Sequence, residues 1–348
     1  MRKRSLYLLL LTCALLFSDN SILAQAGDDP GAYMTAMSSA HVEMNQKYMA
    51  YMSAAAHGRR AKKVEKLRQA ALTSITNSKY KTIEMPYYKG DNSLRQSSID
   101  YIQFCYTVFN EDYSKIVNLE EIAEQSIDRM EAYILLQEKT SEKVKQAAEK
   151  INKASKDFAA KYNVKLIDSK DELSEKMEKA GTVNHYVNQL FIIFFKCNFQ
   201  DAQLVGFMND KKVNDIEQSR TALLKYATDG LAELGGLRTF EGDAQLSNAC
   251  RQLLDFYKKS AEKDIPKLLD FYLKQDNFEK LKKTMESKSS RTKEDVDAYN
   301  AAVKDINAAS NQFNQVNATL NNTRNQLIQQ WEEAQKAFTD AHTPYYKG

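Results

Sequence analysis

A seam of apolar residues near the C-terminus places the strongest constraint on the fold, because its spacing alternates between three and four. The seam consists of Tyr299, Ala302, Ile306, Ala309, Phe313, Val316, Leu320, Thr323 and Leu327. This alternation over about four heptads is the a/d pattern of helices that pack along their length. It predicts one helix from near Thr292 to as far as Ala341, spanning roughly 75 Å at 1.5 Å rise per residue. Such a helix must lie along other helices or project as a coiled coil, and it offers a surface for oligomerisation.

Helical periodicity also dominates the rest of the chain, so we predict an all-α bundle of long helices. Only four prolines and 11 glycines occur among the 348 residues, mostly where the pattern breaks. Apolar residues recur every three or four positions in several stretches, which predict helices at about 30–57, 59–77, 118–134, 211–232, 243–262 and 265–285. We expect Leu234–Leu237, which contains two glycines, to be a loop.

The stretch Met85–Leu94 separates two helical patterns. Pro86 cannot continue the helix that precedes it, and Gly90 permits a positive φ. Asp91 and Ser93 are residues that cap helices, and Ser93 with Gln96 fits a Ser-x-x-Gln capping box. We therefore predict a turn here, followed by a capped helix.

Similar residues recur in the same order about 150 positions apart, which predicts an internal duplication. Tyr88–Asp91 with Leu94 matches Phe240–Asp243 with Leu246, and Lys62–Val64 matches Lys211–Val213. The offsets drift only between 149 and 155 across four such matches. We expect two related helical bundle units, residues 27–165 and residues 166–348. The chain also ends in Pro-Tyr-Tyr-Lys-Gly, which repeats residues 86–90.

The N-terminus has the pattern of a secretory signal peptide. Three basic residues precede a short apolar run, and Ala24-Gln25-Ala26 fits a cleavage site. The run is too short to span a membrane, which needs about 20 apolar residues. We expect cleavage after Ala26 and an exported chain without a transmembrane segment, at the cell surface, in the periplasm or secreted. Lipidation at Cys13 is a weaker alternative, because Thr12 is a poor residue before a lipidated cysteine.

The charge balance argues against nucleic acid as a partner. Residues 27–348 hold 46 Lys and Arg against 45 Asp and Glu, a net charge of +1. Nucleic-acid binding calls for a basic face.

Sulfur-containing residues offer two candidate chemistries. Five methionines lie at 34–52 with His41 among them, and thioethers with an imidazole can bind Cu(I). The alternative, which we prefer, is a helix face packed with flexible apolar side chains. Cys105, Cys197 and Cys250 form no Cys-x-x-Cys motif. We expect three small buried thiols, although an exported protein could form one disulfide from two of these cysteines.

No sequence motif indicates an enzyme or a bound cofactor. The sequence contains no GxSxG, P-loop, GxGxxG or HExxH pattern. The pairs Tyr87-Tyr88 and Tyr345-Tyr346 are candidate aromatic anchors for a sugar or a protein. The alternative, which we prefer, is that each pair closes the end of a bundle after a proline.

The most apolar stretch after the signal is Leu190–Phe195. A run of six apolar residues within one helix predicts burial on every side. The alternative is a segment released into a membrane, as in helical pore-forming proteins.

The chain resembles a family of bacterial surface proteins without an assigned activity. The resemblance rests on the exported N-terminus, on Ala40–Asn45, on Lys63–Arg68 and on Pro86–Leu94. It implies a surface or envelope location and adds no site residue. We therefore expect a non-enzymatic helical scaffold that binds an unidentified protein or surface partner; the alternatives are a membrane-active protein and a metal-binding bundle.

Overall fold

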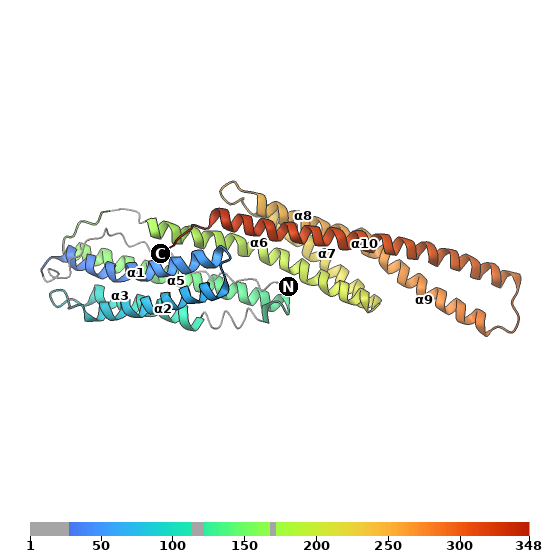
Figure 1. Ribbon diagram of the computed structural model, residues 1–348, viewed down its shortest axis with the longest axis horizontal. Helices are drawn as coiled ribbons and strands as arrows, with labels where there is room; N and C mark the ends of the chain where they lie inside the picture. Colours follow the sequence, from blue (N-terminus) through green and yellow to red (C-terminus); the bar gives the residue numbers. More distant parts are fainter. Residues whose placement is uncertain (1–27, 113–121, 168–171, 348) are drawn as a thin grey trace. The chain divides into compact units, whose positions relative to one another are not determined.

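The computed structural model describes residues 28–112, 122–167 and 172–347, and the elements in these ranges are helices without any strand (Figure 1). The predicted all-α fold is therefore confirmed. The helices are α1 (Pro30–Ala56), α2 (Ala61–Glu84), α3 (Ser93–Thr107), α5 (Ile127–Lys161), α6 (Glu172–Asn209), α7 (Val213–Gly236), α8 (Gln245–Lys259), α9 (Ile265–Ser287) and α10 (Lys293–His342). Two π-helical segments follow α3 and α8, namely η1 (Val108–Asp112) and η2 (Ser260–Asp264). The predicted signal peptide and the start of the helix expected from residue 118 lie outside the described residues.

The chain divides into two compact units. One contains the residues up to Asn188 together with the C-terminal segment from Ala337, and the other is Gln189–Lys336. These ranges differ from the repeats expected at 27–165 and 166–348, because α6 and α10 each contribute residues to both units. Compactness and repetition are separate properties, and the predicted duplication stays a prediction.

In the first unit, α1 packs against α2, α2 against α3, and α3 against α5 (Figure 1). The Asp29 side chain accepts a hydrogen bond from the Gly31 N–H at the start of α1, and Pro30 occupies its first turn. Gly58, with a φ of +61°, follows its end. All five methionines of α1 are buried in the hydrophobic core, which confirms the packing interpretation of that cluster.

In the second unit, α7 packs against α8, and large aromatic side chains fill the core. Trp331 is fully buried and stacks on Phe194, with 4.9 Å between ring centroids. Gly230 lies where a Cβ atom would meet Ile193 Cγ2 at 2.9 Å. The close approach of α7 to α6 at this point therefore requires glycine.

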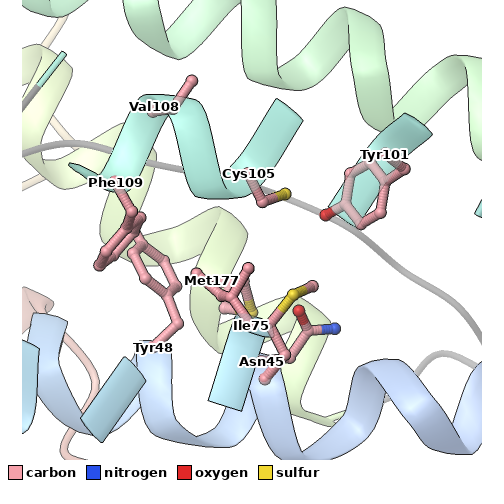
Figure 2. A pocket seen from close by; sticks show the side chains of 9 residues that line it. Asn45, Tyr48, Ile75, Tyr101, Cys105, Val108, Phe109 and Met177 are labelled. Atoms are coloured by element: carbon pink, nitrogen blue, oxygen red, sulfur yellow. The ribbon is translucent and has the colours of Figure 1, made fainter. Parts of the chain in front are cut away.

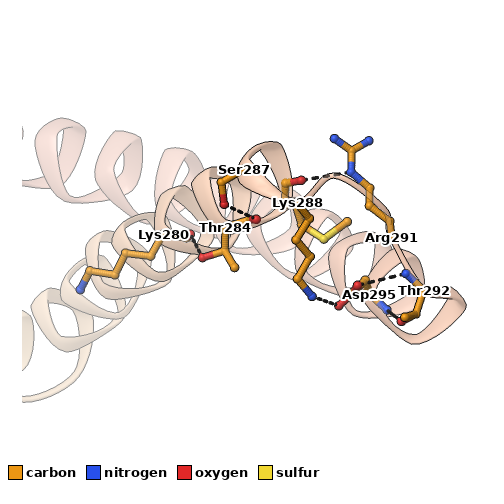
Figure 3. Close-up of polar contacts among 8 residues, drawn as sticks. Lys280, Thr284, Ser287, Lys288, Arg291, Thr292 and Asp295 are labelled. Atoms are coloured by element: carbon orange, nitrogen blue, oxygen red, sulfur yellow. Dashed lines mark hydrogen bonds and ion pairs between the residues drawn. The ribbon is translucent and has the colours of Figure 1, made fainter.

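The long C-terminal helix predicted from the heptad seam is confirmed as α10, which is 50 residues long. Its start is a reciprocal cap, in which Asp295 N–H donates to Thr292 Oγ1 and Thr292 N–H donates to Asp295 Oδ2 (Figure 3). Lys288 pairs with the same Asp295 carboxylate at 2.5 Å, which ties the end of α9 to the start of α10. Such caps satisfy backbone groups that have no partner within the helix.

The seam packs against α9 of the same chain. Phe313 lies 4.6 Å from Phe271 and 5.4 Å from Tyr272, measured between ring centroids, and Tyr299 lies 5.7 Å from Phe278. Seam residues such as Tyr299 and Phe313 are nevertheless only half-buried. One neighbouring helix covers part of an a/d seam, so these side chains keep an exposed edge.

Several local predictions are wrong. The helix expected at 118–134 is interrupted at residues 124–126, and α5 then continues without a break from Ile127 to Lys161. Helix α7 continues through Gly235 and Gly236, so residues 234–236 are not a loop. The expected break between 262 and 265 is instead a π-helical segment that joins α8 to α9. In the run Leu190–Phe195, Phe191 and Ile192 are half-buried while the other four side chains are buried, because one side of α6 faces away from the core there.

The same order of elements occurs twice at a constant offset of 152 residues. Helices α2 and α7 both have 24 residues, and helices α3 and α8 both have 15. Each 15-residue helix is followed by a five-residue π-helical segment, and each is preceded by a tight turn, at 88–91 and at 240–243. The two turns also share their backbone geometry, with positive φ at Lys89, Gly90, Glu241 and Gly242.

We expect Gly90→Ala and Gly242→Ala each to lower the free energy of unfolding by about 1–2 kcal/mol, because an L side chain is strained at these φ values of +82° and +88°. No neighbouring atom would clash with either new methyl group, so backbone strain is the only cost. Gly235→Ala is the matched control, since Gly235 is helical and equally open, and it should stabilise by up to ~1 kcal/mol. Urea denaturation of the three variants measures the difference, and equal effects at all three positions would contradict the argument.

Candidate functional site

The predicted turn after α2 is a two-residue hairpin turn in the first unit. Tyr88 and Asp91 exchange backbone hydrogen bonds of 3.1 and 2.8 Å around Lys89 and Gly90. Positive φ at both central residues is the geometry of a type I′ turn. The predicted capping box does not form, because Asn92 rather than Ser93 is the N-cap of α3. Asp91 instead accepts a hydrogen bond from the Ser93 N–H at 2.8 Å.

Tyr88 anchors this turn in the core. Its ring is buried and lies 5.3 Å from the Tyr33 ring, 5.4 Å from Phe158 and 4.8 Å from Tyr162. The Tyr88 hydroxyl donates to the Asp28 carbonyl, and the Tyr33 hydroxyl donates to the Pro86 carbonyl, both at 2.9 Å. For Tyr88, the structure therefore matches the interpretation that the pair closes the end of a bundle.

Asp91 fixes the turn to α5 by charge. Its Oδ2 atom accepts hydrogen bonds from Lys161 Nζ at 2.7 Å and from the Tyr162 hydroxyl at 3.1 Å. The Lys161 ammonium, together with the Ser93 N–H, holds the pKa of Asp91 well below its usual range. The carboxylate stays ionised at neutral pH and acts as a structural acceptor.

Tyr87, unlike Tyr88, points away from the core. Its side chain is 56% exposed, and the Arg95 guanidinium lies over its ring at 5.1 Å from the centroid. Arg95 also donates to the Ile83 carbonyl at the end of α2. The ring is thus held on a fixed turn, with one face on a cation and the other accessible.

The second tyrosine pair lies at the other end of α1. Tyr345 is 58% exposed and stacks on the His57 ring at 3.5 Å with an interplanar angle of 4°. The Tyr346 N–H donates to Ser53 Oγ at 2.9 Å. Tyr33 contacts the first pair and Ser53 contacts the second, and both residues belong to α1. They are 20 residues apart, so the two pairs are separated by roughly 30 Å along this helix. The structure does not bring the five predicted residues together into one site.

His57 was not singled out by sequence reasoning. Its Nδ1 atom lies 3.1 Å from Asp340 Oδ1, a residue 283 positions away. Ser53 lies one helical turn before His57, and its Oγ accepts the Tyr346 N–H of the C-terminal segment. No short motif spans these residues, so the sequence carries no signal for this contact.

The first unit also contains a small apolar cavity of about 20 Å³ beside η1 (Figure 2). Its lining residues are Met44, Asn45, Tyr48, Ile75, Tyr101, Cys105, Val108, Phe109 and Met177. Figure 2 shows the Tyr48 and Phe109 rings against one another, in an edge-to-face contact with 4.7 Å between centroids. A cavity of this volume holds about one water molecule, so it is a packing defect and not a ligand site.

Cys105, Cys197 and Cys250 are buried and free, as expected from the sequence. Burial raises the pKa of the Cys250 thiol to about 12 and raises that of Cys197 as well. Thiols with raised pKa values are poor nucleophiles and poor metal ligands. These residues therefore serve as core packing.

Comparison with protein-family models, with curated proteins and with solved structures found no match. Within the described part of the chain, no helix combines the length and the apolarity needed to cross a membrane.

Proposed function

We propose that this chain is an exported, non-enzymatic helical scaffold that binds a protein partner at the bacterial envelope or surface. Tyr87 carries the proposal, because its exposed aromatic ring lies directly before a turn that Tyr88 and Asp91 fix to the rest of the unit. Exposed tyrosines on rigid backbone are common anchors of protein interfaces, since they bury a large area at a small entropic cost. The N-terminal pattern and the resemblance to bacterial surface proteins support the location.

The first part of the test is location. Protease shaving of intact cells, with a periplasmic protein as the control, should release peptides of this chain while the control stays protected if the partner is extracellular. Protection of both until the outer envelope is opened would restrict the partner to the periplasm. Recovery of the chain only from the cytoplasm would contradict the proposal.

The second part tests the ring itself. A photo-crosslinking aromatic residue at position 87 should give a defined adduct in intact cells, whereas the same residue at position 80 should not. Tyr80 is the matched control, because it is also exposed and lies on neighbouring α2. Equal adducts from both positions would indicate unspecific contact and would overturn the role of Tyr87.

Tyr87→Ala and Tyr88→Ala should separate binding from folding. We expect Tyr87→Ala to leave the free energy of unfolding within about 0.5 kcal/mol of wild type, as is usual for surface substitutions. Tyr88→Ala should lower it by about 3–5 kcal/mol, because it empties a buried aromatic site. Urea denaturation gives both values.

A further inference from the structure

A second cavity, of about 80 Å³, lies within the second unit beside η2. It is enclosed by the end of α6, the η2–α9 junction and the middle of α10. Its lining is mixed, with apolar side chains such as Leu204, Ile265 and Phe313 and polar side chains such as Ser260, Asn317 and Arg324. Small-molecule sites commonly combine an apolar lining with a few polar groups that orient the ligand.

Ser260 is the feature that points to a ligand. Its side chain is only 2% exposed, and its hydroxyl has no hydrogen-bond partner within the described part of the chain. A buried hydroxyl without a partner costs roughly 1–3 kcal/mol. Ser260 is the first residue of a π-helical segment, and such segments occur frequently at functional sites.

The corresponding position in the first unit shows that serine is not needed for packing. Val108 begins η1, as Ser260 begins η2, and each follows a helix of 15 residues. Val108 lines the apolar cavity of about 20 Å³. The same backbone geometry thus accommodates valine beside a small apolar cavity and serine beside a larger cavity with several polar side chains.

The charges around the cavity cancel. Arg324 binds the buried Asp201 carboxylate through Nε and through Nη2, the latter at 3.1 Å, and its Nη1 donates to Asn321 Oδ1. A bidentate pair of this kind leaves no net charge for an ionic ligand. Other polar side chains of the lining include the Ser260 hydroxyl and the Asn317 amide, which offer both donors and acceptors.

We propose that this cavity binds a small neutral polyol, with its hydroxyls on Ser260 and Asn317 and its carbon atoms against Phe313 and Leu204. The size follows from the volume: since one water needs about 10–15 Å³ of such space, the cavity accommodates on the order of five to eight non-hydrogen atoms. Glycerol and erythritol are of this class and size.

The test uses the full chain after the predicted signal, with erythritol as the probe and saturation-transfer-difference NMR as the readout. Wild type should give a saturable signal with a dissociation constant in the millimolar range or below. Ser260→Val, which installs the valine of the first unit, should weaken binding at least tenfold. Ser219→Ala is the matched control, because it removes a buried serine hydroxyl from α7 outside the cavity lining, and it should bind as wild type does.

Asn317→Leu closes the cavity from α10 and gives a second test if Ser260→Val does not fold. Acetate, a smaller charged probe that the cavity volume also admits, should not compete with erythritol. Water as the only occupant, equal signals from wild type and both cavity variants, or competition by acetate would each overturn the proposal.

Discussion

Replacing Arg324 by methionine is expected to lower the free energy of unfolding by about 3–5 kcal/mol, the cost of leaving one charge of a buried pair without its partner. Asp201 is 3% exposed and lies deep on α6. Burial raises the pKa of its carboxyl group, and Arg324 opposes that rise. Without the guanidinium, the carboxyl must either stay charged in an apolar site or take up a proton.

Trp331 makes this prediction easy to measure. It is the only tryptophan of the chain and is buried in the same unit, so its fluorescence reports the unfolding of that unit in urea. The control is Lys225→Met, which breaks the exposed pair of Lys225 with Asp229, and exposed pairs contribute about 0–1 kcal/mol.

The double variant Arg324→Met with Asp201→Leu should recover much of the loss, because an apolar pair of similar volume is often as stable as a buried ion pair. If Arg324→Met has no larger effect than Lys225→Met, the pair is solvated in solution and the argument fails.

The features that could be predicted from the sequence are those that depend on neighbours along the chain. The spacing of apolar residues determines which face of a helix packs, so α10 could be placed from its seam alone. Pro86 and Gly90 restrict the backbone directly, so the turn between α2 and α3 could also be placed. The loop expected at Gly235 and Gly236 fails because packing in the second unit outweighs the weak helix propensity of glycine, which is about 1 kcal/mol per residue.

The polar contacts in the two cores could not be predicted, because they join residues far apart in sequence. Arg324 and Asp201 are separated by 123 positions, and Asp340 and His57 by 283. Each of these residues, taken alone, has the same local pattern as a solvated charge on a helix. Likewise, the sequence singles out Tyr87 and Tyr88 together. Contacts with residues far away in sequence, such as the Phe158 ring and the Asp28 carbonyl, determine that Tyr88 is the buried one.

The first unit should lose stability in mild acid because of His41. This side chain is buried, neither ring nitrogen has a hydrogen-bond partner within the described residues, and the Tyr101 ring lies edge-on at 5.7 Å between centroids. Burial lowers the pKa of His41 to about 4 from an ordinary value of 6.5. Between these two pH values the unfolded chain binds a proton that the folded chain does not.

Stability should therefore be unaffected by His41 above pH 6.5, fall between pH 6.5 and pH 4, and level off below. The loss is about 1.4 kcal/mol per pH unit, or ~3 kcal/mol in total, by proton linkage. Other carboxylates titrate in the same range, so the informative quantity is the difference between wild type and His41→Met. Methionine matches the neighbouring core residues of α1 and removes both ring nitrogens.

Amide hydrogen exchange in α1 at several pH values measures this difference locally, apart from the unfolding of the second unit. Between pH 7 and pH 4, the free energy of unfolding of His41→Met should rise by about 3 kcal/mol relative to that of wild type. His185 supplies the opposite sign, because its hydrogen bond to Glu138 raises its pKa, so its contribution is present at low pH and is lost as the pH rises. A constant difference between wild type and His41→Met across this range would mean that His41 is solvated or protonated in the folded protein, and the acid sensitivity would then have to come from other groups.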